Sequence, residues 1–178
     1  MKRLVMTGGR GGIGSAFVSR YGDCYDIRSL SRRSGHDIVS HARILPHILG
    51  ADIFVNLAST QFDHQSILLH HCYNMWRAEP DKIILNIGSC SGLDLRFPDT
   101  SPEGPWLYAS SKSGLYNLFH QCLQDHINHR SCRVKMLTIG PTNAGPNLGR
   151  PNTLDPNTVA DEMYRLLTTP SLYHSVLL

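Results

Sequence analysis

The sequence predicts an α/β fold: a doubly wound, mainly parallel sheet that forms a single compact domain over residues 1–178. Three observations predict it. Short apolar runs of strand length alternate along the chain with segments of helical periodicity. The first apolar run passes through a glycine-rich turn directly into a helical segment. Polar residues also follow several of the runs, where parallel strands would end at a common edge of the sheet.

The composition is that of an ordinary globular domain, with 41% hydrophobic and 17% charged residues. A chain of 178 residues can bury a sizeable core. The net charge is only +3 and no long run of Lys and Arg occurs, which argues against a nucleic-acid partner. No apolar stretch reaches the roughly 20 residues needed to cross a bilayer, so we expect no membrane partner either.

The five cysteines are odd in number and include no Cys-x-x-Cys pair, as is typical of reduced thiols in the cytoplasm. We therefore expect a cytoplasmic protein. Cys122 and His126 stand four residues apart, and His129 and Cys132 follow closely, so zinc is conceivable there. Because these four residues lie on a predicted amphipathic helix that runs out into a turn, we predict no metal site.

A glycine-rich turn over residues 7–14 joins the first predicted strand, residues 4–6, to a helix over residues 15–21. Glycines permit a tight turn and the close approach of a pyrophosphate, whose charge the N–H groups at the helix start can bind. Strand, turn and helix in this order predict a Rossmann-type dinucleotide site rather than a glycine turn without a ligand. The residues of this segment expected to contact the cofactor are Gly8, Arg10, Gly12, Ile13 and Gly14.

A second predicted strand, residues 24–30, is followed by Ser31, Arg32 and Arg33. Folds that bind NAD commonly place an acidic residue here to hold the ribose 2′-hydroxyl. Two arginines, with Arg10 in the glycine turn, instead suit the 2′-phosphate of NADP, because guanidinium groups bind phosphate through forked, charge-assisted hydrogen bonds. We therefore predict NADP(H) rather than NAD(H). The alternative is that Arg32 and Arg33 are only solvated.

Residues 37–39 resemble a short third strand. The segment that follows, residues 40–50, forms a brief helix at best, because Pro46 interrupts any longer helix that does not begin there.

The next strand, residues 52–58, contains Asn56, and a helix is predicted over residues 65–77. Residues 83–87 form another apolar strand, which leads to Ser89. Asn56, Ser89 and the glycine turn all fall at the carboxyl edge of the sheet, where parallel sheets bind their ligands.

A polar loop with three prolines, residues 93–107, precedes a helix that opens at Tyr108. The apolar residues of this helix form one stripe, which we expect in the core or at a subunit interface. These residues are Leu115, Leu118, Phe119, Cys122 and Leu123.

The chain then continues with a strand over residues 133–139 and a proline-containing loop over residues 140–157. The length of this loop and its place after a strand end suit a lid or a substrate loop. Residues 158–167 are predicted to form a helix, and residues 175–178 a last strand.

Tyr108 and Lys112 stand four residues apart on the predicted helix, so both side chains can point into one pocket. A free tyrosine titrates near pH 10, and one that exchanges a proton near neutrality needs its anion stabilised by about 4 kcal/mol. A neighbouring ammonium group supplies part of this stabilisation. The spacing alone is a weak signal, since helices often carry a packed Tyr and a solvated Lys by chance.

In this order, the glycine turn, the segment 56–58, Ser89 and the Tyr108/Lys112 pair resemble the short-chain dehydrogenase/reductase family. The resemblance extends from residue 1 to about residue 143, and the chain would be an unusually short member. The glycine spacing fits the standard cofactor motif of the family and also that of its extended, sugar-modifying branch.

The resemblance implies a role for each motif. Tyr108 would exchange a proton with the substrate oxygen, Lys112 would hold the nicotinamide ribose and favour the phenolate, and Ser89 would hydrogen-bond the carbonyl oxygen. The cofactor would carry the hydride. The further residues implied to contact the cofactor are Ser31, Asp37 and Ile38 near the adenosine, and Asn56, Ala58, Tyr108, Lys112, Gly140 and Thr142.

Two departures from the family pattern concern its helices. Residues 33–52 are too few for the usual helix, strand and helix, so we expect one helix to be missing. The helical asparagine that helps hold a proton-relay water in the family has no secure counterpart. The candidates are Asp63, His64, Gln65 and Asn74, and the sequence favours none of them.

We therefore predict an NADP(H)-dependent oxidoreductase that interconverts a carbonyl and an alcohol in a small-molecule substrate. By family analogy we expect a homo-oligomer, either a dimer or a tetramer. A nucleotide-sugar epimerase or dehydratase fits the glycine spacing, but little room remains for a sugar domain. A non-enzymatic NADP(H)-binding sensor or assembly protein fits the short chain, although Ser89, Tyr108 and Lys112 argue against it.

Overall fold

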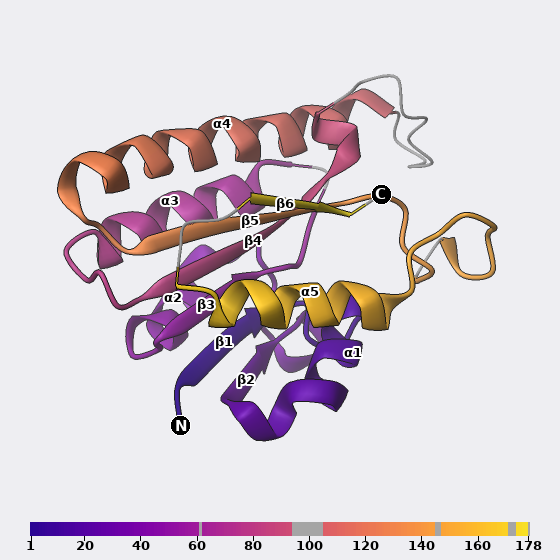
Figure 1. Ribbon diagram of the computed structural model, residues 1–178, viewed down its shortest axis with the longest axis horizontal. Coiled ribbons are helices and arrows are strands. Elements are labelled where there is room, and N and C mark those ends of the chain that lie inside the picture. The colour runs from indigo at the N-terminus through magenta and orange to yellow at the C-terminus, as the bar shows by residue number, and fades with distance from the viewer. Residues whose placement is uncertain (61, 94–104, 145–146, 171–173, 178) are drawn as a thin grey trace.

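The computed structural model describes residues 1–60, 62–93, 105–144, 147–170 and 174–177. Its centre is a six-stranded sheet in the order β2-β1-β3-β4-β5-β6, and every neighbouring pair of strands is parallel (Figure 1). The strands are β1 (Arg3–Thr7), β2 (Asp26–Leu30), β3 (Ile53–Asn56), β4 (Ile83–Ser89), β5 (Arg133–Ile139) and β6 (His174–Leu177). The predicted parallel sheet is confirmed.

Helices cover both faces of the sheet, with α1 and α5 on one face and α2, α3 and α4 on the other (Figure 1). The helices are α1 (Gly12–Tyr21), α2 (His41–Leu49), α3 (His64–Trp76), α4 (Pro105–His129) and α5 (Pro156–Thr168). Three short 3-10 helices are η1 (Gly22–Cys24), η2 (Arg32–Ser34) and η3 (Cys90–Gly92). The chain passes from β1 outward to β2 and then returns to β3 on the other side of β1. This reversal makes the carboxyl edge between β1 and β3 the expected ligand site of a doubly wound sheet.

Each face of the sheet has its own hydrophobic core. Val5 of β1 packs with the side chains of α2, α3 and α4, whereas its neighbours Leu4 and Met6 pack with those of α1 and α5. All three side chains are fully buried. A central strand such as β1 therefore reads as a continuous apolar run, because both of its faces are covered.

Residues 37–39 form a turn and not the predicted short strand. The Asp37 carboxylate accepts a hydrogen bond from the backbone N–H of Val39, at 3.1 Å, and the Asp37 carbonyl accepts one from Ser40. Aspartate often satisfies nearby backbone donors in this way, and the turn then occupies the donors that a strand would use. The prediction of a strand was wrong because it weighed only the apolar character of the segment.

Helix α2 begins at His41 and continues past Pro46 to Leu49. The brief helix is confirmed, but Pro46 lies inside it and does not end it. Ile44 and Ile48 of this helix are fully buried, whereas Pro46 is exposed. Packing of the apolar face thus outweighs the one backbone hydrogen bond that proline cannot donate. Between β2 and β3 the described chain has this single α-helix, as the short interval predicts.

The predicted apolar stripe of α4 lies in the core. Leu115, Phe119 and Cys122 are buried among the side chains of α3 and the sheet, and Leu118 and Leu123 pack against them. Of the two places allowed by the sequence, the core is therefore the correct one for this stripe. The helix begins at Pro105, three residues before Tyr108, and most of the predicted loop 93–107 lies outside the described residues.

The loop after β5 is closed at its base. Thr142 and Leu154 form a parallel bridge, with hydrogen bonds from Leu154 N to Pro141 O and from Asn143 N to Leu154 O. Helix α5 begins at Pro156, where the Asp155 carboxylate caps the first turn by accepting from Asn157 N. The predicted loop therefore ends at Asp155, two residues earlier than expected, and its role as a lid or substrate loop stays a prediction.

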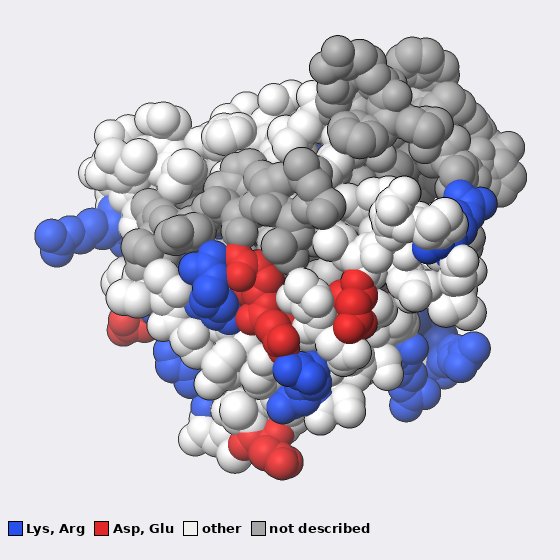
Figure 2. All heavy atoms as spheres, turned by 45° about the vertical axis from the view of Figure 1, so that its right-hand side comes forward, with Lys and Arg blue, Asp and Glu red and all other residues white. Residues whose placement is uncertain are grey.

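The described surface mixes charges of both signs. On the face shown in Figure 2, Asp and Glu side chains lie among Lys and Arg side chains and not in a separate area. This mixture agrees with the small net charge of +3. Within the described residues, none of the helices combines the length and the apolar character needed to cross a bilayer.

Gly14 lies where the first turn of α1 packs against the glycine turn. A Cβ atom added there would lie 2.4 Å from Gly8 O and 2.6 Å from Gly9 Cα, and backbone atoms cannot easily move aside. We expect Gly14→Ala to reduce the free energy of unfolding by about 1–3 kcal/mol, as overpacking does elsewhere. Urea denaturation followed by the fluorescence of buried Trp76 measures this change.

Gly22→Ala is the matched control, because a Cβ atom added to Gly22 meets nothing within 4 Å. Its unfolding midpoint should stay close to that of the unmodified protein. Equal midpoints for the two variants would contradict the tight packing assigned to Gly14.

Candidate functional site

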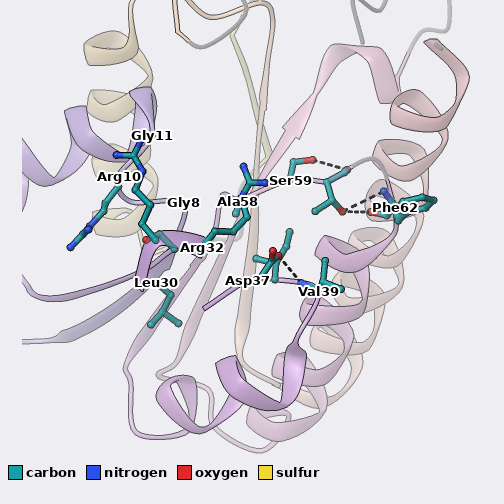
Figure 3. Close-up of a pocket in the computed structure, with 14 residues that line it drawn as sticks. Gly8, Arg10, Gly11, Leu30, Arg32, Asp37, Val39, Ala58, Ser59 and Phe62 are labelled. Atoms are coloured by element: carbon teal, nitrogen blue, oxygen red, sulfur yellow. Dashed lines mark hydrogen bonds between the residues drawn. The ribbon is translucent and has the colours of Figure 1, made fainter. Parts of the chain in front are cut away.

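A pocket of about 630 Å³ opens at the carboxyl ends of β1, β2 and β3, next to the reversal of strand order. Figure 3 shows Gly8, Arg10 and Gly11 on one side of it and Ser59 and Phe62 on the other. Its lining residues come from the turns after these three strands: Gly8, Arg10, Gly11, Leu30, Ser31, Arg32, Arg33, Asp37, Ile38, Val39, Ala58, Ser59, Thr60 and Phe62. The fold thus gathers at one site residues that are as far apart in the sequence as Gly8 and Phe62.

Gly8 turns the chain from β1 toward α1 with a φ of +75°, a conformation that residues with a side chain rarely adopt. Its N–H donates to Leu30 O at 3.0 Å. The hydroxyl of the preceding residue, Thr7, accepts from the backbone N–H groups of Leu57 and Ala58, each at 3.1 Å. These bonds join the ends of the three strands and fix the floor of the pocket.

The start of α1 adjoins the pocket. Gly11 precedes the helix and lines the pocket, and no side chain caps the helix at this position. The first N–H groups of an α-helix have no acceptor within the helix, so they can bind an anion. Gly12 is exposed, and Gly14 and the partly buried Ile13 form the first turn of the helix.

Gly12 also has a packing reason to be glycine. A Cβ atom added there would lie 2.3 Å from Ala144 Cβ, so the loop after β5 reaches the start of α1. The glycines of the motif therefore serve two purposes in this chain: Gly8 forms the turn, whereas Gly12 and Gly14 allow close packing. A phosphate-binding role for Gly12 stays a prediction.

The arginine residues predicted to recognise NADP all lie at the pocket. Arg10, Arg32 and Arg33 are exposed and line it, as does Ser31, which begins η2. Three guanidinium groups around one pocket favour a ligand with more negative charge than a pyrophosphate alone.

Asp37 and Ile38 line the same pocket, on the turn before α2. Ile38 is 4% exposed and belongs to the core, so this wall of the pocket is anchored. Ala58 lies across from Gly8, where a Cβ atom added to Gly8 would be 3.2 Å from Ala58 N. Asp37 and Ile38, which are predicted to contact adenine, therefore lie on the pocket wall together with Ala58.

Asn56 does not line this pocket. Its side chain is fully buried, and its amide group donates to Gln65 O at 2.8 Å and to Asn86 Oδ1 at 3.0 Å. Asn56 therefore joins β3 to β4 and to the first turn of α3. Gly140 and Thr142, both predicted to contact the nicotinamide end of the cofactor, also lie outside the pocket lining, at the base of the loop after β5.

Lys112 is buried where α4 crosses the end of β4, with 3% of its surface exposed. Its ammonium group donates to Gln65 Oε1 at 2.7 Å and to Ile87 O at 3.2 Å. Nζ lies 5.4 Å from the centre of the Tyr108 ring, so the two side chains share one side of the helix, as their spacing predicts. Burial lowers the pKa of Lys112 to about 7, because a charged amine is poorly solvated there.

Ser89 ends β4, two residues after the carbonyl group that Lys112 contacts. Its Oγ accepts from Ser91 N at 3.3 Å and so begins η3. Gly92, which ends η3, lies directly against α4: an added Cβ atom would be 2.7 Å from Lys112 Cβ, and its carbonyl accepts from the Ser113 hydroxyl at 2.7 Å. The three predicted catalytic residues therefore belong to one junction between β4 and α4.

Tyr116 lies one helical turn beyond Lys112 and is 4% exposed. Its hydroxyl group is hydrogen-bonded to that of Thr138 on β5. Burial raises the pKa of Tyr116 to about 12, so this phenol stays protonated near neutral pH and serves to fix α4 on the sheet.

The sequence missed one residue at this junction because it could not choose among four candidates. The structure brings Gln65 into contact with Lys112. Asp63 is exposed, His64 contacts His41, and the exposed Asn74 bonds to a neighbouring histidine of α3. A polar residue in the first turn of the helix after β3 was the available signal, but only the packing of α3 on the sheet shows that it is buried.

Zinc was conceivable at Cys122, His126, His129 and Cys132, but three of these residues make other contacts or are buried as neutral thiols. Cys122 and Cys132 are buried, and burial raises the pKa of each thiol to about 12. The His126 ring lies within hydrogen-bonding distance of Cys132 O. Among the residues that the structure describes, no group of three or more His, Cys, Asp or Glu side chains could hold a metal ion. All five cysteines are unpaired.

Two pairs of imidazole rings attach α2 to its surroundings, next to the pocket wall. His41 Nε2 lies 3.3 Å from His64 Nδ1, and His47 Nε2 lies 2.9 Å from His36 Nε2. Such a contact needs one neutral ring, because two protonated rings have no acceptor nitrogen. Burial, followed by the nearby rings, lowers the pKa of His41, and burial also contributes most to the lowered pKa of His47.

We expect the protein to lose stability as the pH falls below about 6.5. A histidine with a lowered pKa in the folded state binds fewer protons there than in the unfolded chain. The free energy of unfolding therefore rises with pH through this window and decreases on acidification.

Urea midpoints measured from about pH 7.5 to about pH 5 test this dependence. Replacing His41 and His47 with glutamine should flatten it, whereas replacing the exposed His120 should leave it unchanged. The same slope in all variants would contradict this origin.

Comparison with solved structures shows what this fold is similar to. The chain resembles 3-hydroxyacyl-CoA dehydrogenase type-2 from Mycobacterium avium, with a TM-score of 0.76 and 16% identity over 98% of this chain and 93% of that one. It resembles 3-ketoacyl-(acyl-carrier-protein) reductase from Brucella melitensis complexed with NADH, with a TM-score of 0.78 and 15% identity over 99% and 95% of the two chains. It also resembles a short-chain dehydrogenase from Sphingobium yanoikuyae in complex with NADPH, with a TM-score of 0.75 and 13% identity over 99% and 87%.

No protein-family model matches the sequence, and no curated protein matches it significantly. The likeness to these structures nevertheless covers nearly the whole chain. The chain therefore has the fold of the short-chain dehydrogenases/reductases, and the resemblance predicted from the sequence is confirmed at the level of the fold.

Proposed function

We propose that this chain, with the fold of the short-chain dehydrogenases/reductases, is an NADP(H)-dependent oxidoreductase that interconverts a carbonyl and an alcohol. One observation carries the proposal. The buried ammonium group of Lys112 lies 5.4 Å from the centre of the Tyr108 ring, where α4 meets the carboxyl end of β4. A cation held there favours the phenolate form of the tyrosine and so supports proton exchange near neutral pH.

The nucleotide pocket supports the choice of cofactor. Gly8 and the start of α1 would hold the pyrophosphate, and Asp37 and Ile38 would contact the adenine. The exposed arginines at the pocket would bind the 2′-phosphate of NADP. Among the similar structures, one is a complex with NADPH and another a complex with NADH, which fits a nicotinamide cofactor without choosing between the two forms.

Three residues of the chain, Ser89, Tyr108 and Lys112, would each have a separate role in the reaction. Ser89 would donate a hydrogen bond to the substrate oxygen and place it within reach of Tyr108. Tyr108 would exchange the proton with that oxygen, while Lys112 would stabilise the phenolate. The cofactor, when bound, supplies or accepts the hydride. The substrate would be a small molecule with a ketone, aldehyde or alcohol group.

Titration of the purified protein with NADPH and with NADH, followed by cofactor fluorescence, tests the binding step. We expect a micromolar dissociation constant for NADPH and weaker binding of NADH. A panel of ketones and aldehydes, followed by the loss of NADPH absorbance, then tests turnover. The absence of any NADPH binding at micromolar protein and cofactor would refute the proposal.

A second candidate function is a non-enzymatic sensor of NADP(H). The direct contact between Gln65 and Lys112 favours it, because an asparagine that holds a relay water is absent from this position. A sensor would bind NADPH as tightly as the enzyme would. It would not oxidise NADPH in the presence of any ketone or aldehyde of the panel. We also propose a cytoplasmic homo-oligomer on the grounds given by the sequence, and light scattering of the eluted protein measures its mass.

A further inference from the structure

We propose that Gln65 is the residue that positions Lys112, by presenting a fixed carbonyl oxygen directly to its ammonium group. This inference rests on the proposed function for its catalytic consequence, while the contact itself stands on the structure. It differs from a relay through water, because the side-chain amide and the ammonium group touch at 2.7 Å.

Three hydrogen bonds fix the orientation of the Gln65 amide. Its Nε2 donates to Asn56 O at 2.6 Å and to Ile87 O at 3.0 Å, and its Oε1 accepts from Lys112. A flipped amide would place its oxygen against two carbonyl oxygens and its NH₂ group against the ammonium. Only one orientation is therefore chemically possible.

The backbone of Gln65 is fixed as well. The side chain of Asn56 donates to Gln65 O, and the side chain of Gln65 donates to Asn56 O. This reciprocal pair holds the first turn of α3 against the end of β3. Both side chains are nearly or fully buried, at 4% exposure for Gln65 and none for Asn56. The acceptor that Lys112 meets therefore belongs to a rigid and dry part of the fold.

Ile87 O completes the arrangement. It accepts from Gln65 Nε2 and from Lys112 Nζ, as the two lone pairs of a carbonyl allow. Lys112 thus donates to two protein acceptors, and its Nζ lies 5.4 Å from the centre of the Tyr108 ring. An amide oxygen and a carbonyl oxygen favour the charged amine, whereas burial opposes it. The oxygen of Gln65 therefore favours the charged form of Lys112 against the effect of burial.

The test measures the ionisation of Lys112 in the protein without cofactor, by side-chain nitrogen NMR over a range of pH. Lys112→Arg assigns the signal. Gln65→Leu removes the acceptor and should lower the pKa of Lys112. Gln65→Glu places a carboxylate beside the ammonium group and should raise it by about one unit or more. A merely structural role would destabilise both variants without moving the pKa in opposite directions.

Gln65→Asn keeps the amide but withdraws it by one methylene group, so it should lower the pKa less than Gln65→Leu does. It serves as the second comparison if the glutamate variant does not fold. Gln121→Leu and Gln121→Glu make the same changes at an exposed position of α4 and should leave the Lys112 signal unchanged. A Lys112 pKa that is the same in all folded Gln65 variants would overturn the proposal.

The same variants separate this inference from the proposed function. If the protein reduces a carbonyl compound, the acidic limb of the kcat profile should move with the pKa of Lys112, while the dissociation constant of NADPH changes less. If the pKa moves as expected and no substrate is turned over, the positioning role stands and the oxidoreductase proposal fails. If turnover occurs and neither the pKa nor the pH profile responds to Gln65, the positioning role fails alone.

Discussion

Replacing Tyr108 with phenylalanine is expected to lower kcat by about 100-fold or more, because the ring remains while the exchangeable proton is lost. The dissociation constant of NADPH should change little, since the pocket proposed to bind the nucleotide is lined by other residues. The Tyr108 ring lies on the same side of α4 as the buried Lys112, with its centre 5.4 Å from Lys112 Nζ. Steady-state rates with a substrate from the panel, together with a fluorescence titration, measure both quantities.

Tyr164→Phe is the matched control. This tyrosine stacks on Tyr21 on the opposite face of the sheet, with ring centres 4.2 Å apart. Its loss should leave kcat unchanged. A Tyr108→Phe variant with full activity would show that proton exchange takes place elsewhere. If the unmodified protein binds NADPH but turns over no substrate, the result would favour the second candidate function, a non-enzymatic sensor of NADP(H).

Replacing Arg32 and Arg33 together with glutamine is expected to raise the dissociation constant of NADPH by about 100-fold, whereas that of NADH changes by only a few fold. The reason is that a hydrogen bond to a charged group contributes roughly 1.5–3 kcal/mol, and only NADPH carries the 2′-phosphate. Both residues are exposed at the pocket, so the substitution leaves the core intact. Parallel titrations with the two cofactors measure the change in preference.

Arg130→Gln serves as the control, since this exposed arginine lies between α4 and β5, at the opposite edge of the sheet. It should bind both cofactors like the unmodified protein. Equal losses of NADPH and NADH affinity in the double variant would mean that the arginines contact a phosphate common to both. In that case the predicted NADP preference would be wrong.

Several features could be predicted because the chain encodes them locally. The order of strands and helices follows from apolar runs and their periodicity, which depend on near neighbours. The strand, glycine turn and helix at the start of the chain also lie within a few residues of one another, and Gly8 has the positive φ that such a turn requires. The spacing of Tyr108 and Lys112 places them on one side of α4 whatever surrounds the helix.

One failure arose where the answer depends on distant residues, and another where two local interactions compete. A helix passes through Pro46 because Ile44 and Ile48 reach a core built from other elements. Residues 37–39 form a turn because Asp37 bonds to the backbone next to it, and the apolar pair Ile38 and Val39 does not reveal that competition.

The sequence by itself thus determined the fold class, the glycine turn between β1 and α1 and the pairing of a phenol with an amine, since each depends on patterns among near neighbours in the chain. Only the tertiary structure decided that Gln65 is the partner of Lys112, that Asn56 is buried outside the pocket lining, and that a side chain at position 12 would meet the loop after β5. The physical reason is that burial and hydrogen-bond partners arise when elements far apart in the chain pack together. Packing also changes the chemistry: it removes water from Lys112 and lowers its pKa to about 7, which the spacing of two residues on a helix cannot do alone.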